Sequence, residues 1–442
     1  MASGGFAFLL LAAAVALIIV LTGKCKINAF PVLLLAAFAY GVGIGLPLQE
    51  VLAKVKEGFG ATLASIGVVI TAGTMMGVIL EKTGAALVMT KCILGLVGKK
   101  RAPLAMNMAG MVVSVPVFCD SGYVILTPLN RALAKESGQS MVVMAVSLAT
   151  GLFATHCMVP PTPGPIAAAG TLSADLGQVI VYGLIVSVPA SLAAYAWTAR
   201  VAAKYDIPVT GGESYSALMQ KYGKLPSAFL SFLPLFLPIL LILLKSLAEL
   251  PSRPFGHTVG AYIATVGEPV LALTMGLLCS FLLVPRKHLA TAADNWLGLG
   301  IRDAASVLVI TGAGGALGRV IQASPIVEYI QESVAGTGVG IFFPFVIAAA
   351  LKTAQGSSTV AIITTANIMA PMLGQLGVNP ALCVVAIGAG AMVVSHANDS
   401  FFWVVSQFSD LPVDLSYKVY TTATAVEGVV AIGAAYCLSL VV

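Results

Sequence analysis

The chain is poor in charge. Only 9% of its 442 residues are Asp, Glu, Lys or Arg, against roughly a quarter in an ordinary soluble domain. This scarcity excludes a water-soluble enzyme. Hydrophobic residues make up 59% of the chain and the mean hydropathy is +0.99. The sequence therefore predicts an all-α polytopic membrane protein whose solvent is the lipid bilayer.

Motifs for metals, cofactors and nucleic acid are also missing. The seven cysteines include no CxxC pair, and no HExxH occurs, so neither a zinc site nor a disulfide framework is indicated. The net charge of +5 is spread between apolar runs and forms no basic patch for nucleic acid. We expect no metal, no cofactor and no nucleic-acid partner. Residues 1–6 lack Lys and Arg and no convincing cleavage motif follows, so we expect the first span to be retained.

Long apolar runs are what the sequence has instead. About ten runs reach the roughly 17–25 residues that a helix needs to cross the bilayer: 5–22, 28–48, 60–80, 141–158, 176–199, 226–247, 259–285, 297–321, 380–396 and 418–441. Two further apolar regions, 103–134 and 339–374, are interrupted at Cys119 to Gly122 and at Gln355 to Thr359. Each predicts a re-entrant hairpin of two half-helices, because non-helical backbone at membrane depth is tolerated only against protein or a wet cavity.

The positions of the basic residues predict the orientation. Lys and Arg occur at Lys24 and Lys26, at Lys99 to Arg101, and in the polar stretch 201–225, and such residues face the cytoplasm. Both termini then lie outside, and 201–225 is a cytoplasmic linker between two halves of about five spans each.

The two halves resemble each other. Thr155-His156 returns as Ser395-His396, about 240 residues later, and the polar tip at Asp120 returns at Gly356. Features that recur in order at nearly one offset indicate an internal repeat. An odd number of crossings per copy turns the second copy upside down, as in many secondary transporters. We expect a first inverted repeat at 1–200 with its hairpin at 103–134, and a second at 226–442 with its hairpin at 339–374.

Asp120 is the acid at the first tip. It lies within an apolar sequence, where an unpaired carboxylate would cost several kcal/mol. In the functional interpretation this carboxyl loads and releases a proton as access to the site alternates. In the structural interpretation it accepts N–H bonds from Gly122 and Tyr123 at the start of the second half-helix.

The second tip carries a cation and three hydroxyls. Lys352 precedes Gly356 by four positions; it either neutralises an anionic substrate, or snorkels to the interface or pairs with a carboxylate. A half-helix that begins at Ser357, Ser358 and Thr359 offers free N–H groups and a positive dipole end to a carboxylate. Two such tips on one cavity would hold an organic anion.

Two histidines occupy matching positions in the repeat. His156 and His396 are each either hydrogen-bonded core residues or part of a site where a span meets an irregular segment. After His156, the run from Pro160 to Pro165 cannot continue a helix, so the chain is expected to unwind there. Glu427 lies inside the last span, and the sequence assigns it no role.

These motifs resemble the gluconate:H+ symporter (GntP) family of the ion transporter superfamily. The resemblance spans nearly the whole chain and rests on Phe118-Cys119-Asp120-Ser121-Gly122-Tyr123, Thr155-His156 with the following prolines, Gly356-Ser357-Ser358-Thr359, and Ser395-His396-Ala397-Asn398-Asp399. It implies a multi-pass permease of a bacterial cytoplasmic membrane, not an enzyme. It further implies a homodimer with an elevator mechanism that takes up small hydroxy-monocarboxylates with protons.

The resemblance also implies the site. Substrate contacts are expected at both tips and at the unwound segments, namely at Asp120, Ser121, Gly122, Tyr123, His156, Lys352, Gly356, Ser357, Ser358, Thr359, His396, Asn398 and Asp399. Proton carriers are expected among Asp120, His156, His396 and Asp399. The first tip reads Cys-Asp-Ser-Gly where gluconate permeases usually have a bulkier tip, and Thr162 stands where histidine is common. Gluconate or another aldonate, glycerate and a D-serine-like acid therefore all stay open as substrates.

Three other functions compete with a proton symporter. Sodium coupling is the nearest, because carbonyls beside Ser121, Ser357 and Asn398 could hold a cation. An intramembrane enzyme could use the Asp, His and Cys side chains, but glycines and serines at broken helices suit binding better than catalysis. A channel is disfavoured, because paired half-helices with charged residues near the midplane favour an occluding site.

Overall fold

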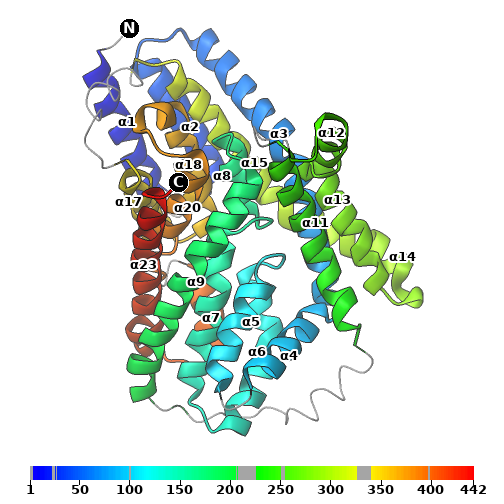
Figure 1. Ribbon diagram of the computed structural model, residues 1–442. Coiled ribbons are helices and arrows are strands. Elements are labelled where there is room, and N and C mark those ends of the chain that lie inside the picture. The colour runs from blue at the N-terminus through cyan, green and yellow to red at the C-terminus, as the bar shows by residue number, and fades with distance from the viewer. Residues whose placement is uncertain are drawn as a thin grey trace.

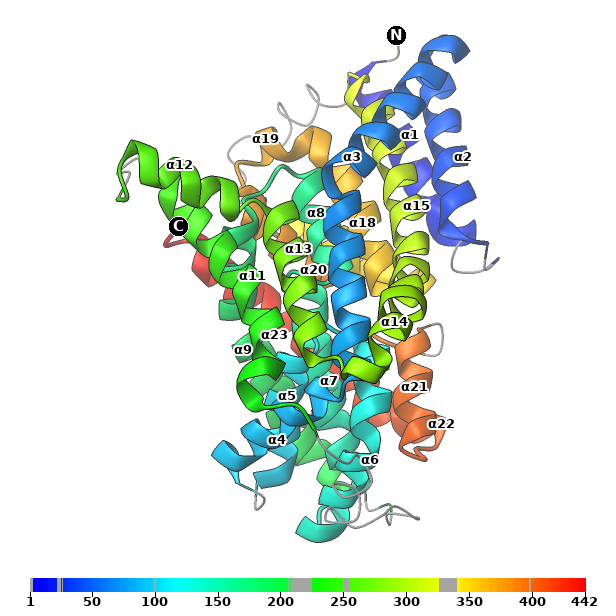
Figure 2. The ribbon, with the colours of Figure 1, turned by 90° about the vertical axis from the view of Figure 1, so that its right-hand side faces the viewer.

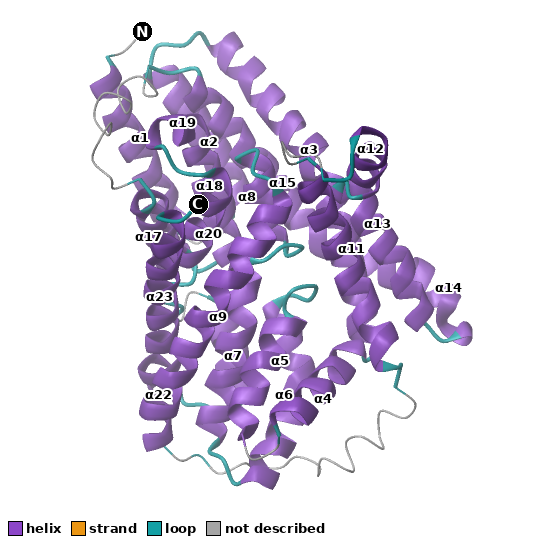
Figure 3. Ribbon diagram, viewed as in Figure 1, coloured by secondary structure: helices purple, strands orange, loops and turns teal. Residues whose placement is uncertain are grey.

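The structure is a computed structural model. It describes residues 3–21, 25, 27–98, 101–205, 207, 225–249, 254–325, 340–396 and 399–442, and in these ranges all regular structure is helical (Figure 3). Most of the linker predicted at 201–225 lies outside the described residues.

The first half of the chain folds into nine helices within the described ranges: α1 (Gly4–Ile19), α2 (Ala29–Gly43), α3 (Leu48–Lys82), α4 (Ala85–Val97), α5 (Ala102–Val113), α6 (Cys119–Ser137), α7 (Met141–Met158), α8 (Pro163–Thr171) and α9 (Leu176–Val201). Helix α7 coincides with the predicted span 141–158, and all of its residues are buried. The chain unwinds between α7 and α8, as the prolines predict.

The main helices of the second half are α11 (Ala228–Ala248), α12 (His257–Val266), α13 (Pro269–Ser280), α15 (Leu297–Gln322), α17 (Phe342–Gln355), α18 (Ser358–Met369), α20 (Pro380–Gly390), α21 (Ser400–Phe408) and α23 (Thr422–Ser439). The short helices α14 (Leu289–Thr291), α19 (Leu373–Leu376) and α22 (Val413–Ser416) connect them.

Fewer helices than predicted are long enough to cross a membrane alone. The described residues contain six such apolar helices, or eight if each of two bent pairs is one span, against about ten expected. One reason is length: α20 has 11 residues, or about 16 Å at 1.5 Å per residue, half the hydrocarbon thickness. Another is bending. The expected span 259–285 is two helices, α12 and α13, bent by 58° where Gly267, Glu268 and Pro269 interrupt it.

Both predicted interruptions are present, but the first lies elsewhere. Helix α5 ends at Val113 and α6 begins at Cys119, so the break covers 114–118 and includes Pro116. The predicted break at Cys119 to Gly122 is wrong, because these residues form the first turn of α6, where an acid such as Asp120 is favoured by the helix dipole. The second break lies at Gly356 and Ser357, where Gly356 has a φ of 95° that favours glycine.

The two interrupted hairpins lie in opposite halves of the molecule. In Figures 1 and 2, α5 and α6 lie in the lower part with α4, and α18 lies in the upper part with α20. Helix α7 packs against α5 and α9, and α15 packs along α3. A Cβ at Gly315 of α15 would meet the backbone oxygen of Gly58 in α3 at 2.8 Å, so backbone packs directly on backbone here, as small residues permit in membrane proteins.

The order of helices recurs along the chain. Helices α5 and α17 begin at 102 and 342, α7 and α20 at 141 and 380, and the two nine-residue helices α8 and α21 at 163 and 400. Ser173 after α8 and Asp410 after α21 both have positive φ, 51° and 54°. The offset between the pairs stays close to 240 residues, as in the sequence motifs.

Candidate functional site

A cavity of about 190 Å³ lies where the two interrupted hairpins meet. Five segments of the chain line it: the start of α6, the end of α7, the middle of α15, and the starts of α18 and α21. The lining residues are Phe118, Cys119, Asp120, His156, Asp303, Ser306, Val307, Ile310, Ser357, Ser358, Thr359, Val360, Ile363, Asp399, Ser400 and Phe401. We refer to it as the central cavity.

Three helix N-termini face this cavity. Helices α6, α18 and α21 all begin among its lining residues. Ser357 caps α18, with its Oγ accepting from the Val360 amide at 3.3 Å, and Asp399 caps α21, with Oδ1 accepting from the Phe401 amide at 3.1 Å. The first turns of these helices carry N–H groups without intrahelical partners and the positive dipole ends. Such a convergence favours an anion.

Asp120 and His156 both present unpaired polar atoms. Among the described residues, neither Asp120 Oδ1 nor His156 Nδ1 has a hydrogen-bond partner. The Gly122 amide donates to the Phe118 carbonyl at 2.8 Å, so it does not cap the Asp120 carboxylate. The His156 ring lies 6.0 Å from the ring of Phe118, centroid to centroid. Buried polar groups are normally satisfied, so these two unpaired atoms mark Asp120 and His156 as candidate functional residues.

Lys352 is paired with Asp399. Its side chain is fully buried; Nζ donates to Asp399 Oδ2 at 2.5 Å and to the Gly356 carbonyl, and lies 5.6 Å from the centroid of the Phe153 ring. Ser395 Oγ donates to the same Asp399 oxygen at 2.5 Å. Lys352 is not among the residues that line the central cavity, so of the alternatives predicted for it, the carboxylate partner matches the geometry.

The other predicted site residues lie around the cavity or away from it. Tyr123 is buried, and its hydroxyl lies 2.6 Å from Ser409 Oγ. Gly122 faces α7, where a Cβ would meet Leu152 at 2.9 Å. His396 Nε2 is 2.8 Å from the Thr353 carbonyl.

Two further predicted site residues lie outside the cavity lining, and a third is not described by the structure. Gly356 forms the turn of the second tip, and Ser121 is half-buried in α6; neither lines the cavity. Asn398 lies outside the described residues.

Sequence reasoning missed the contribution of α15. Asp303 and Ser306 line the cavity, yet the region 297–321 reads as a continuous span. The available signal was the acid itself, since a charged residue inside an apolar run is a functional candidate. In the described part of the chain, no group of three His, Cys, Asp or Glu residues is placed to hold a metal ion.

Comparison with known proteins agrees with this architecture. The family described as GntP family permease matches residues 6–441. A gluconate permease of Pseudomonas aeruginosa is 33% identical over 98% of each chain. The D-serine transporter DsdX of Escherichia coli is 30% identical over 97% of each chain.

A solved structure shares the fold. MtrF of Neisseria gonorrhoeae, from a class of antimetabolite efflux pumps, superposes with a TM-score of 0.69 over 96% of this chain and 97% of that one, at 14% identity. The family match and the apolar helices place this chain in the cytoplasmic membrane of a bacterium as a multi-pass transporter, not an enzyme. The chain belongs to the GntP permease family.

Proposed function

We propose that this permease carries a small hydroxy-monocarboxylate into the cell together with protons. The observation that carries the proposal is the central cavity, where three helix N-termini meet beside the unpaired atoms of Asp120 and His156. N-termini bind a carboxylate without a full formal charge. The acid and the imidazole supply the proton.

The lining chemistry supports the substrate class. Hydroxyls of Ser306, Ser357, Ser358 and Thr359 line the cavity beside the helix ends, so hydroxyl and carboxylate groups of one ligand find partners together. Gluconate and D-serine, which the relatives' names give as their substrates, both contain a carboxylate and a hydroxyl. We infer a related acid for this chain, with gluconate or another aldonate, glycerate and D-serine as candidates.

Proton coupling is favoured over sodium coupling by Lys352. Its ammonium contacts a carboxylate oxygen and a backbone carbonyl at the second tip, which are oxygen ligands that a cation site would use. Because a cation already occupies these oxygens, Asp399 is committed to the ion pair. Asp120 and His156 are then the first candidates for proton carriers, ahead of Asp399 and His396.

We further propose alternating access by two inverted repeats. The recurring helix order at an offset near 240 residues, and hairpins in opposite halves of the molecule (Figure 1), support an arrangement in which the hairpins move as one body in an elevator motion. A homodimer is part of this proposal. The repeat boundaries are 1–200 and 226–442, joined through the cytoplasmic linker.

The test is uptake by purified protein in liposomes. In sodium-free choline buffer, an inward proton gradient should drive accumulation of at least one of radiolabelled gluconate, glycerate, lactate and D-serine, and a protonophore should abolish it. Uptake that requires sodium and ignores the proton gradient would replace the proposal with sodium coupling. Recovery of a chemically altered substrate from the liposomes would point to an enzyme.

A further inference from the structure

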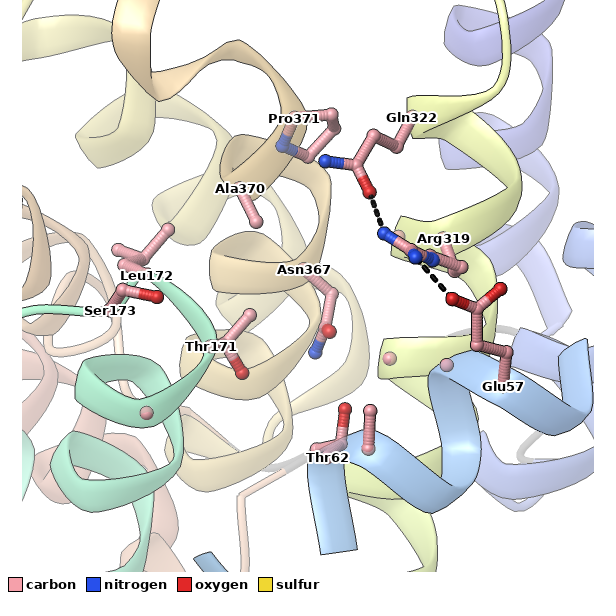
Figure 4. Close-up of a pocket in the computed structure, with 15 residues that line it drawn as sticks. Glu57, Thr62, Thr171, Leu172, Ser173, Arg319, Gln322, Asn367, Ala370 and Pro371 are labelled. Atoms are coloured by element: carbon pink, nitrogen blue, oxygen red, sulfur yellow. Dashed lines mark hydrogen bonds and ion pairs between the residues drawn. The ribbon is translucent and has the colours of Figure 1, made fainter. Parts of the chain in front are cut away.

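A second, larger cavity shares helices α15 and α18 with the central cavity. Its volume is about 440 Å³, and Figure 4 shows Thr62, Thr171, Arg319 and Asn367 around it, from α3, α8, α15 and α18. Helix α15 contributes Gly315 and Arg319 here, and Val307 and Ile310 to the central cavity. We call the second space the outer cavity, because the orientation predicted from the basic residues places the C-terminal end of α15, with Arg319 and Gln322, outside.

Helix α18 also lines both cavities. Ile363 lines the central cavity and Asn367 lines the outer one, so the two are one helical turn apart on this helix. Asn367 is buried and donates to the Ile363 carbonyl at 2.7 Å. The two cavities are therefore adjacent along α18.

Arg319 is the cation of the outer cavity. Its guanidinium donates to Glu57 of α3 and, at 2.6 Å, to Gln322 Oε1 (Figure 4). The side chains of Arg319 and Glu57 are 40% and 46% exposed, and an exposed ion pair contributes little to the stability of a fold. The packing of α15 on α3 does not need it, because Gly58 and Gly315 already bring the two backbones together.

The rest of the lining can bind hydroxyl groups. Thr62 and Thr171 face the cavity from α3 and α8, and the buried Thr171 hydroxyl has no hydrogen-bond partner among the described residues. A guanidinium with several N–H donors matches a carboxylate in planar geometry. The hydroxyls and the Asn367 amide match the alcohol groups of the same molecule.

We propose that the outer cavity is a capture site for the carboxylate substrate, at which Arg319 exchanges Glu57 for the incoming anion. The inference rests on the proposed function, because it takes its ligand to be the same hydroxy acid. Glu57 competes with the substrate for the guanidinium and pairs with it while no anion is bound. When the anion leaves Arg319 for the central cavity, the ion pair between Arg319 and Glu57 forms again.

Two substitutions with opposite outcomes test this. Arg319→Gln removes the attraction and should raise the KM for uptake by about tenfold, the loss of one charge-assisted hydrogen bond. Glu57→Gln removes the competitor and should lower the KM by about threefold. If the pair served only to hold α3 and α15 together, both substitutions would act in the same direction on KM and melting temperature, and that result would overturn the proposal.

Two further measurements distinguish a loss of substrate capture from a folding defect: the salt dependence of the KM, and the KM of the variant Arg319→Lys. In the wild type, added choline chloride should raise the KM, because salt screens the attraction of an anion to an exposed guanidinium. Arg319→Gln should lose this dependence, and Arg319→Lys should keep most of it. A salt dependence that is unchanged in Arg319→Gln contradicts capture by this residue.

The two proposals fail in different ways. If the wild type transports none of gluconate, glycerate, lactate and D-serine, the proposed function is wrong, and the proposed capture site is then wrong as well. If the wild type carries one of them but the KM in Arg319→Gln and Glu57→Gln equals the wild-type value, the capture site alone is wrong.

Discussion

The two hairpin tips hold their charges differently. At the first tip, Asp120 follows a break of five residues and presents a carboxylate oxygen without a hydrogen-bond partner in the described structure. At the second, Lys352 and Asp399 form a buried ion pair closed by the Gly356 carbonyl. A charge that is already paired is a fixed part of the site, whereas an unpaired acid is free to change its protonation. In the mechanism we propose, the first tip exchanges the proton and the second tip provides a fixed electrostatic anchor.

The largest expected effect is at the first tip. Asp120→Asn removes the carboxyl that we propose as a proton carrier, at nearly constant volume, so proton-driven uptake in liposomes should fall to the level of empty vesicles. The melting temperature should stay close to that of the wild type. Asp414→Asn, an exposed acid in α22, is the control and should leave uptake unchanged. Normal uptake by Asp120→Asn with a normal dependence on external pH would remove this residue from the mechanism.

Breaking the ion pair at the second tip should lower the stability of the protein. Lys352→Ala leaves the Asp399 carboxylate buried without its cation, which typically costs about 3–5 kcal/mol. We expect a large fall in melting temperature in detergent. The double variant Lys352→Ala with Asp399→Ala removes both charges and should recover part of the loss. If the single variant were as stable as the wild type, the ion pair would not be the anchor of this tip.

A smaller effect separates capping from binding at Ser357. Ser357→Ala removes the cap of α18 and should cost about 1 kcal/mol, and it should also raise the KM because the hydroxyl lines the central cavity. Ser227 caps α11 with the same 3.3 Å geometry, from its Oγ to the Leu230 amide, away from this cavity. Ser227→Ala should show the stability loss without the change in KM. Equal KM values in both variants would limit Ser357 to a capping role.

The smallest effect is expected at the far end of the first hairpin. Arg131 of α6 pairs with Asp410 at 2.8 Å, but the two side chains are 19% and 53% exposed, so the pair should contribute about 0.2–1 kcal/mol. Asp410→Asn should lower the melting temperature by little, and high salt should lower that of the wild type toward the same value. If Asp410→Asn lowered the melting temperature as much as Lys352→Ala, the exposed and buried ion pairs would not differ in their contribution to stability.

Residues with a local signature could be predicted from the sequence. The presence of two interruptions, the unwinding after α7 and the offset near 240 residues follow from proline, glycine and hydropathy along the chain, although the first interruption was predicted a few residues too late. Asp120 and His156 stood out as polar residues in apolar runs. The cavity lining from α15 was missed, because it depends on which face of a long helix meets the hairpins. The pairing of Lys352 with Asp399 joins residues 47 positions apart, and sequence alone left it as one of several alternatives.

Helix lengths could be predicted less well. Apolar composition defines where a chain prefers lipid, but it does not fix where a helix ends. Helix α20 ends at Gly390 although its predicted span continues to 396, and α4 was not expected, because its apolar stretch is short. Tertiary packing decides these ends.

Helix α15 separates the two cavities by only a short stretch, from Thr311 to Gly314 between Ile310 and Gly315. At 1.5 Å per residue this is roughly 6 Å of protein. Where water fills the cavities on both sides of so thin a layer, a transmembrane voltage drops mainly across it, and each elementary charge that crosses gains about 2.3 kcal/mol per 100 mV. Under the coupling we propose, one proton per monovalent anion moves no net charge and each further proton carries current, so the voltage dependence of uptake reports the stoichiometry.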